Sequence, residues 1–287
     1  MEVVETVSGL REHIAGWRRS GDTIALVPTM GALHAGHLTL VKAARDRAKR
    51  VCATIFVNPT QFAPNEDFAS YPRKERADQE LLRGEKTDLL YMPSVEEMYP
   101  AGHTTRVRVA AIAQTLEEDF RPGHFDGVAT VVAKLLLQAL PDVALFGEKD
   151  YQQLLVVRRM VRDLDIPVRI EGVPTVREPD GLALSSRNAY LTAEERAIAP
   201  ALHRTITAVA RSVAAGAEPE QRAAEATEAL MRSGFRKVDY VAVRDAETLQ
   251  PIGDRSRPAR VLAAAWLGRA RLIDNVAVDQ LPLPSSR

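Results

Sequence analysis

The sequence predicts an α/β fold in which a doubly wound, mostly parallel sheet is followed by a second, smaller α+β domain. Three observations support this prediction. Short apolar runs alternate with helical patterns up to about Thr175. Polar residues suited to chemistry come directly after those runs. The composition then changes near Arg177. Alternating strands and helices are typical of a parallel sheet with helices on both faces.

The strands predicted for the first domain are short, apolar and bounded by turn residues. They cover residues 23–28, 51–57, 88–92, 143–146 and 167–172. Apolar residues at helical spacing predict helices that begin at residue 37 and cover 77–83, 128–140 and 152–164. In such a Rossmann-like sheet, ligands bind at the carboxyl ends of the strands.

The second domain is predicted from a different pattern. An Ala-rich helix over 192–215 opens with Thr192 and Glu195 in capping-box spacing. A second helix follows over 219–233, and strands are expected over 237–243 and 260–267. We therefore expect one domain over 1–175, a smaller lid domain over 176–281 and a disordered tail over 282–287.

Composition narrows the class of protein. The chain has 287 residues, with 38 Lys plus Arg and 38 Asp plus Glu, so its formal net charge is zero. A neutral chain gives no argument for a nucleic-acid or membrane partner. The single cysteine, Cys52, opens an apolar run and is expected to be a buried thiol. No signal peptide or membrane-spanning run is evident, so a cytoplasmic protein is expected.

The segment PTMGALHAGH, residues 28–37, lies at a predicted strand-to-helix junction. Gly31 and Gly36 let the backbone approach a ligand, and the amides of the following helix suit phosphate. His34 and His37 share one face of the opening turn and can donate hydrogen bonds to a nucleotide. A metal pair or a helix cap is the alternative. Because we expect the helix to keep its cap, alanine at either position should leave folding nearly unaffected.

Cationic and hydroxyl side chains follow later strands. Lys149 comes after the run 143–146 and provides a point charge for phosphate. Ser185, Ser186 and Arg187 lie in LSSRN, where the guanidinium offers a planar fork for phosphate oxygens. A loop of this kind can close over a triphosphate. The alternative for both cations is ordinary surface charge.

Seven blocks together resemble one family. They are PTMGALHAGH, FVNPTQF, YPR, RPGHFDGV, GEKDYQQ, LSSRN and RLIDN, in that order. HAGH is one form of the HxGH signature of adenylyl-transfer enzymes, and the set is similar to pantothenate synthetases over about residues 4–278. Leu184 stands where the family often has methionine, which is a volume-conserving change.

The resemblance implies an activity and a set of partners. It implies an ATP-dependent ligase that activates pantoate as pantoyl-adenylate and joins it to β-alanine, releasing AMP and pyrophosphate. It also implies a homodimer. His34, His37, Lys149 and Arg187 would be catalytic. The residues it places against ATP are Pro28, Thr29, Met30, Gly31, His34, His37, Gly147, Lys149, Asp150, Val176, Leu184, Ser185, Ser186 and Arg187.

Pantoate carries hydroxyls and a gem-dimethyl group. The amides of Gln61 and Gln153 provide both donors and acceptors for hydroxyls, and the resemblance makes them the pantoate-binding pair. Asn58 would lie nearby, although Asn58-Pro59 is equally consistent with a strand end. Met30, with Phe62 and Val131, would form the apolar wall.

Mg²⁺ is expected with ATP, and Asp78 and Asp150 are its candidate protein ligands. Asp150 is equally suited to bind the ribose or to stabilise a loop. Asp78 falls in a predicted helix, where a solvated carboxylate is the common outcome. In RPGHFDGV, His124 and Arg121 precede an apolar helix. His124 is expected to be structural, and Asp126 is expected to cap that helix.

Two other functions remain open from the residues alone. One is a nucleotidyltransferase that leaves the nucleotide on its product. GEKDYQQ and NPTQF argue against it because they provide a pocket beside the phosphates. The other is a catalytically silent nucleotide-binding scaffold, which the intact His34, His37, Lys149 and Arg187 argue against. Release of both AMP and pyrophosphate would decide for the ligase.

Overall fold

The computed structural model describes residues 1–63, 66, 68–69, 71–253 and 256–278. The chain divides into two compact units, Met1–Val176 and Arg177–Arg287, and each is described by itself. The tail predicted over 282–287 lies outside the described residues.

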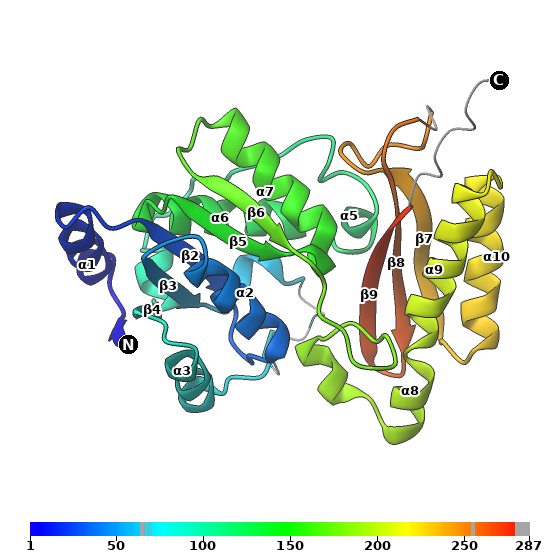
Figure 1. The fold of residues 1–287 in the computed structure, drawn as a ribbon, viewed down its shortest axis with the longest axis horizontal. Coiled ribbons are helices and arrows are strands. Elements are labelled where there is room, and N and C mark those ends of the chain that lie inside the picture. The colour runs from blue at the N-terminus through cyan, green and yellow to red at the C-terminus, as the bar shows by residue number, and fades with distance from the viewer. Residues whose placement is uncertain (64–65, 67, 70, 254–255, 279–287) are drawn as a thin grey trace. The chain divides into compact units, whose positions relative to one another are not determined.

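The first unit contains a six-stranded sheet in the order β1-β4-β3-β2-β5-β6 (Figure 1). All neighbouring strands pair in parallel. The strands are β1 (Glu2–Val4), β2 (Ile24–Thr29), β3 (Arg50–Ile55), β4 (Leu89–Tyr91), β5 (Val143–Gly147) and β6 (Arg169–Val173). The predicted parallel sheet is confirmed.

Alternate residues of β2 pack into two separate hydrophobic cores, one on each face of the sheet. Ile24 and Leu26 pack with one group of helices, α1 (Val7–Arg19), α6 (His124–Ala139) and α7 (Tyr151–Asp163). Ala25 and Val27 pack with the other group, α2 (Ala35–Arg45) and α3 (Glu75–Gly84). The sheet is therefore doubly wound, and its strands are apolar on both faces because both faces are covered.

The strand order places a topological switch point between β2 and β5. From β2 the chain moves through β3 to β4 on one side, and from β5 to β6 on the other. A crevice forms at the carboxyl ends of such strands because their connections leave in opposite directions. The short elements near these ends are the 3₁₀ turns η1 (Pro59–Gln61) and η2 (Glu148–Asp150); α4 (Val95–Met98) and α5 (Glu117–Phe120) lie in the β4–α6 connection.

The second unit is a three-stranded antiparallel sheet in the order β7-β8-β9. Its strands are β7 (Lys237–Asp245), β8 (Ala259–Leu267) and β9 (Ala270–Val278). Its helices are η3 (Ser186–Tyr190), α8 (Ala193–Ile198), α9 (Ala201–Ala214) and α10 (Pro219–Arg232). α9 and α10 lie side by side against the sheet and share one core with it (Figure 1).

Three local predictions differ from the structure. The helix expected over 192–215 is two helices, because Pro200 has no N–H to donate and separates α8 from α9. The Thr192 capping box is confirmed. α6 begins at His124, which was expected to precede the helix. Asp126 does not cap it: Gly123 is the N-cap, and Asp126 lies in the first turn. There its negative charge still suits the positive end of the helix dipole.

Candidate active site

The first predicted site element is the loop of residues 30–34, which joins β2 to α2. His34 is the N-cap of α2, and its Nδ1 accepts a hydrogen bond from the Gly36 amide at 3.2 Å. His37 completes a capping box, because its Nδ1 accepts from the His34 amide at 3.3 Å. The helix-cap alternative is therefore correct. The expectation that alanine at His34 would leave the cap intact is wrong, because His34 is the cap.

These two bonds fix the chemistry of the imidazoles. Burial, together with the charge of Lys149, lowers the pKa of His34 to about 4. Burial and the neighbouring His34 lower the pKa of His37 to about 3. Both rings are neutral at pH 7. A neutral ring whose Nδ1 accepts must carry its proton on Nε2, so each histidine has an Nε2–H donor not used by its cap.

Lys149 and Asp150 lie in the turn that follows β5, the strand paired with β2. The Lys149 ammonium is 3.6 Å from the Asp150 carboxylate and only 18% exposed. Both charges act on the pKa values of His34 and His37. Two of the three segments predicted to bind phosphate therefore meet at the carboxyl ends of β2 and β5, the strands that flank the switch point.

The predicted pantoate residues Met30, Asn58 and Gln61 are in contact. The Asn58 amide donates to Gln61 Oε1 at 3.0 Å, and the Gln61 amide donates to Met30 Sδ at 3.1 Å. Asn58 is fully buried; its Oδ1 also accepts from Tyr99 Oη at 2.8 Å. Asn58 therefore does more than end a strand, since it organises the turn of residues 58–61.

A second group of residues holds this turn from the side of α6. His124 is buried, and burial with the nearby Arg121 charge lowers its pKa to about 4. Its Nδ1–H donates to the Gln61 carbonyl at 2.9 Å, and its Nε2 accepts from Arg121 at 3.1 Å. At Gly127 an added Cβ would collide with the Thr60 carbonyl oxygen. The contacts favour the structural role expected for His124.

Two adjacent glutamines on α7 differ sharply. The buried Gln152 donates to the carbonyls of Ile112 and Thr115 at 2.8 and 2.7 Å and accepts from the Glu117 amide at 3.3 Å. Gln153 is half-buried, and among the described residues none hydrogen bonds its side-chain amide. The amide predicted to bind pantoate is thus the one left available.

Asp78 is buried, with 2% of its surface exposed, so the expected solvated carboxylate is wrong. Its two oxygens accept from the amides of Ala32 and Leu33 at 2.9 and 2.8 Å. Thr29 is also used internally: its hydroxyl donates to the Thr54 carbonyl at 2.6 Å and accepts from the Gly31 amide. No local sequence pattern signals either contact with the loop, because the partners lie on separate elements.

Of the other predicted nucleotide residues, Pro28 lies in β2 and Gly147 ends β5, and Val176 is the last residue of the first unit. The rest lie in the second unit. Leu184 to Arg187 are half-buried, and Ser185 caps η3 by accepting from the Arg187 amide at 3.3 Å. The Asn188 side chain donates to the Ala183 carbonyl at 3.0 Å. These bonds give the LSSRN segment a defined backbone within its own unit.

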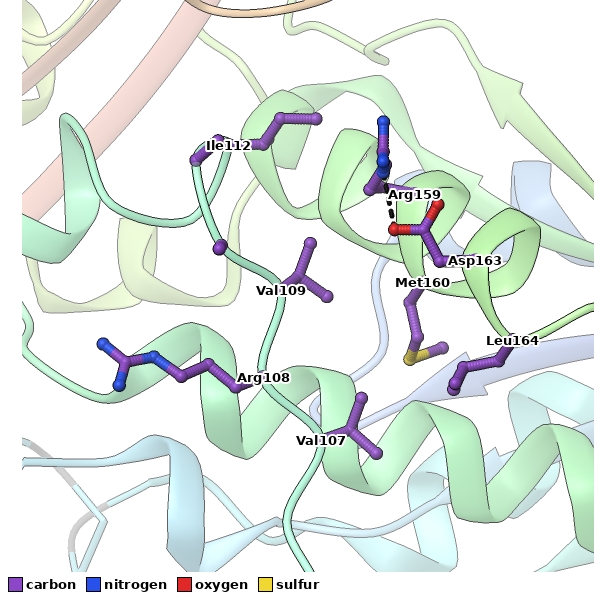
Figure 2. Close-up of a pocket in the computed structure, with 10 residues that line it drawn as sticks. Val107, Arg108, Val109, Ile112, Arg159, Met160, Asp163 and Leu164 are labelled. Atoms are coloured by element: carbon purple, nitrogen blue, oxygen red, sulfur yellow. Dashed lines mark hydrogen bonds and ion pairs between the residues drawn. The ribbon is translucent and has the colours of Figure 1, made fainter.

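Two other features do not enlarge the site. Cys52 lies in the core, where burial raises the pKa of its thiol to about 12, so the predicted buried thiol is confirmed. A cavity of about 420 Å³ lies between residues 107–112 and the last turn of α7 (Figure 2). Its lining includes Arg108, Arg159 and Met160 but no predicted site residue. Arg159 is about 12 Å along α7 from Tyr151, so the cavity lies away from the carboxyl ends of the strands.

The family model for pantoate-beta-alanine ligase matches residues 2–277. The chain belongs to the pantoate–β-alanine ligase family. The resemblance predicted from the seven blocks is confirmed, as is the predicted ATP-dependent ligase class.

Members of this ligase family are similar to the chain over almost their whole length. A pantothenate synthetase of Paramagnetospirillum magneticum is 58% identical over 279 residues, covering 97% of this chain and 98% of that protein. The crystal structure of the Thermus thermophilus enzyme has a TM-score of 0.90 at 49% identity, covering 97% and 99% of the two chains. The Francisella tularensis ligase, crystallised with beta-gamma ATP and beta-alanine, has a TM-score of 0.82 at 34% identity, covering 97% and 98%.

Proposed function

We propose that the carboxyl ends of β2 and β5 form the catalytic site at which this ligase makes pantoyl-adenylate and then transfers the pantoyl group to β-alanine. The observation that carries the proposal is the meeting of His34, His37 and Lys149 at the switch point of the sheet. A crevice at this position suits a nucleotide. Two neutral donors and one cation suit its phosphates.

In the first half-reaction the pantoate carboxylate attacks the α-phosphorus of ATP. An oxygen–phosphorus bond forms, and the bond to pyrophosphate breaks. A carboxylate is already ionised at neutral pH, so this step needs alignment and charge compensation rather than a general base. The two Nε2–H groups would donate to phosphate oxygens, and Lys149 would offset the charge that develops on the departing pyrophosphate.

Pantoate would lie against the 58–61 turn and the start of α7. Gln61 and Gln153 present amides that match its hydroxyls, and Met30 offers an apolar contact. Asn58 would act chiefly by fixing Gln61, since it donates to Gln61 Oε1. Support for the role of Gln153 comes from its side-chain amide, which no described residue hydrogen bonds.

In the second half-reaction the neutral amine of β-alanine attacks the activated carbonyl carbon. A carbon–nitrogen bond forms, the bond to the phosphate oxygen breaks, and AMP leaves while the amine loses a proton. We propose that Ser185, Ser186 and Arg187 act on the nucleotide phosphates. On this proposal residues 1–175 bind the substrates and residues 176–281 act as a lid.

An ATP-dependent ligase is expected to use a divalent metal, and we propose Mg²⁺. The described residues contain no group of three or more His, Cys, Asp or Glu side chains suited to hold a metal. That fits an ion held mainly by nucleotide phosphates and water, as Mg²⁺ commonly is. Asp150, whose carboxylate is 46% exposed beside Lys149, is the proposed protein ligand. Such an ion would neutralise phosphate charge.

We also propose a cytoplasmic homodimer that binds no nucleic acid. The equal numbers of acidic and basic residues support the last point. Among the described residues, every helix is too short or too polar to span a membrane.

A quenched-flow experiment tests the two-step scheme. Mixing the protein with ATP, Mg²⁺ and pantoate should yield pantoyl-adenylate and pyrophosphate without β-alanine. Adding β-alanine should then release AMP and pantothenate in equal amounts. Formation of pyrophosphate only when β-alanine is present, with no adenylate at any time, would overturn the scheme. A nucleotide retained on the final product would indicate a nucleotidyltransferase instead.

A further inference from the structure

The buried carboxylate of Asp78 reaches from α3 to the backbone of the 30–34 loop. Asp78 is 2% exposed, and its oxygens accept from Ala32 N at 2.9 Å and Leu33 N at 2.8 Å. Among the described residues no cationic side chain pairs with it. A buried charge is tolerated only when it is hydrogen bonded, so these two amides are its compensation.

The loop has a backbone that needs such support. Gly31 has φ 80° and Ala32 has φ 50°, so two consecutive residues lie in the left-handed region. That region is unfavourable for alanine. A Cβ added at Gly31 would lie 3.1 Å from Asp78 Oδ2 and 3.2 Å from Ile55 Cγ2. The carboxylate is therefore packed closely against the loop as well as bonded to it.

His34 directly follows Leu33, and the capping bonds of His34 and His37 orient both imidazoles. We propose that Asp78 is a positioning residue whose carboxylate fixes Ala32 and Leu33 and thereby sets the orientation of the two histidine rings. This gives Asp78 a different role from the metal ligand predicted from the sequence. The inference rests on the proposed function, because it assumes that these rings contact ATP.

The 58–61 turn has its own supports, Asn58 and His124. Loosening the backbone of Ala32 and Leu33 should therefore impair ATP use and leave pantoate binding largely intact, since Met30, the loop residue that contacts Gln61, precedes the two bonded amides. A general loss of folding would impair both equally. A metal ligand would instead change the concentration of Mg²⁺ needed for activity.

The test compares Asp78→Asn with Glu80→Gln, a control on the same helix whose carboxylate is 66% exposed. Asparagine is similar in shape but directs an N–H₂ group at one of the two amides. Initial rates of adenylate formation would be measured while ATP, pantoate and Mg²⁺ are varied in turn, at a temperature where both variants are folded by circular dichroism. Should Asp78→Asn fail to fold, Asp78→Glu, which keeps the charge but displaces it, is measured in the same way.

We expect kcat/KM for ATP to fall about a hundredfold in the Asp78 variant, as small misplacements of catalytic groups do. The KM for pantoate and the half-activating Mg²⁺ concentration should stay within about twofold of the control, because the contacts to pantoate and to the metal are retained. Unchanged kcat/KM for ATP would overturn the proposal, and so would recovery of the rate at high Mg²⁺. If the wild-type protein formed no adenylate, the proposed function itself would fail instead.

Discussion

The 30–34 loop and the 58–61 turn follow neighbouring parallel strands but are held in place by different means. In the first, His34, His37 and Asp78 all accept from backbone amides, and the outer nitrogens of the rings are left over. In the second, buried side chains bond to one another and to backbone carbonyls. The first arrangement presents donors for a charged ligand. The second presents a shaped, neutral surface. Apart from Met30, which contacts Gln61, a substitution in one region should therefore affect the use of either ATP or pantoate.

The largest expected effect comes from removing Lys149, the cation beside the 30–34 loop. Lys149→Ala should lower kcat at saturating substrates by about a thousandfold, the upper range for one lost electrostatic stabiliser. The KM for pantoate should change little, because the 58–61 turn does not depend on Lys149. Lys42→Ala, which removes a 63% exposed ammonium on α2, is the control. Full turnover by Lys149→Ala would contradict the phosphate role.

The next prediction separates the two nitrogens of His34. His34→Asn keeps an acceptor at the cap, since asparagine is a preferred N-cap, but it has no group in place of Nε2–H. We expect adenylate formation to fall about a hundredfold with thermal stability unchanged. His34→Ala should show the same loss of rate and also lose about 1 kcal/mol of stability from the missing cap. Near-normal rates in His34→Asn would mean that the ring serves only as a cap.

Much of the first unit's fold could be predicted from the sequence. The order of strands and helices was predictable because periodicity is local, and so was the arrival of His34 and Lys149 at strand ends. The N-terminal helix α1 was not predicted, although Thr6 caps it and Leu10 and Ile14 have helical spacing. Strand β9 was not predicted as a strand, although it contains the motif RLIDN.

What the sequence did not reveal is which polar side chains are already used by the protein. Asp78 lies in a helix with charged neighbours, and nothing local indicates that it is buried against Ala32. Gln152 and Gln153 are identical in type and adjacent, yet only their positions around α7 decide which amide is available. The break at Pro200 was a local signal that the Ala-rich pattern obscured.

The third prediction uses that adjacent pair of glutamines on α7. Gln153→Ala should raise the KM for pantoate about tenfold and leave that for ATP unchanged, because one buried hydroxyl of the substrate loses its partner. Gln152→Ala should leave both constants unchanged and lower stability by about 1–3 kcal/mol, since three backbone groups of residues 112–117 lose theirs. Steady-state kinetics and urea unfolding measure the two effects. If Gln152→Ala raised the KM for pantoate and Gln153→Ala lowered only the stability, pantoate would be assigned to the wrong glutamine.

The smallest effect concerns the pH dependence of the support beneath Gln61. The His124 pKa is about 4 in the folded protein, below the ordinary value of 6.5, because burial and Arg121 disfavour the charged ring. The unfolded chain therefore binds a proton first as the pH falls. The stability due to this residue is complete above about pH 6.5 and is lost toward pH 4, by at most about 1.4 kcal/mol per pH unit.

His124→Asn removes this titration but keeps an N–H to donate to the Gln61 carbonyl. At pH 7 the variant should be less stable than the wild type by about 1–2 kcal/mol, because Arg121 loses its acceptor. The difference should shrink as the pH falls from 6.5 toward 4, since only the wild type loses stability through this ring. Urea unfolding across that range measures it. A difference that stays constant from pH 6.5 to pH 4 would mean that the His124 ring is charged in the folded protein. The 58–61 turn would then depend on charge as the 30–34 loop does, which its contacts do not indicate.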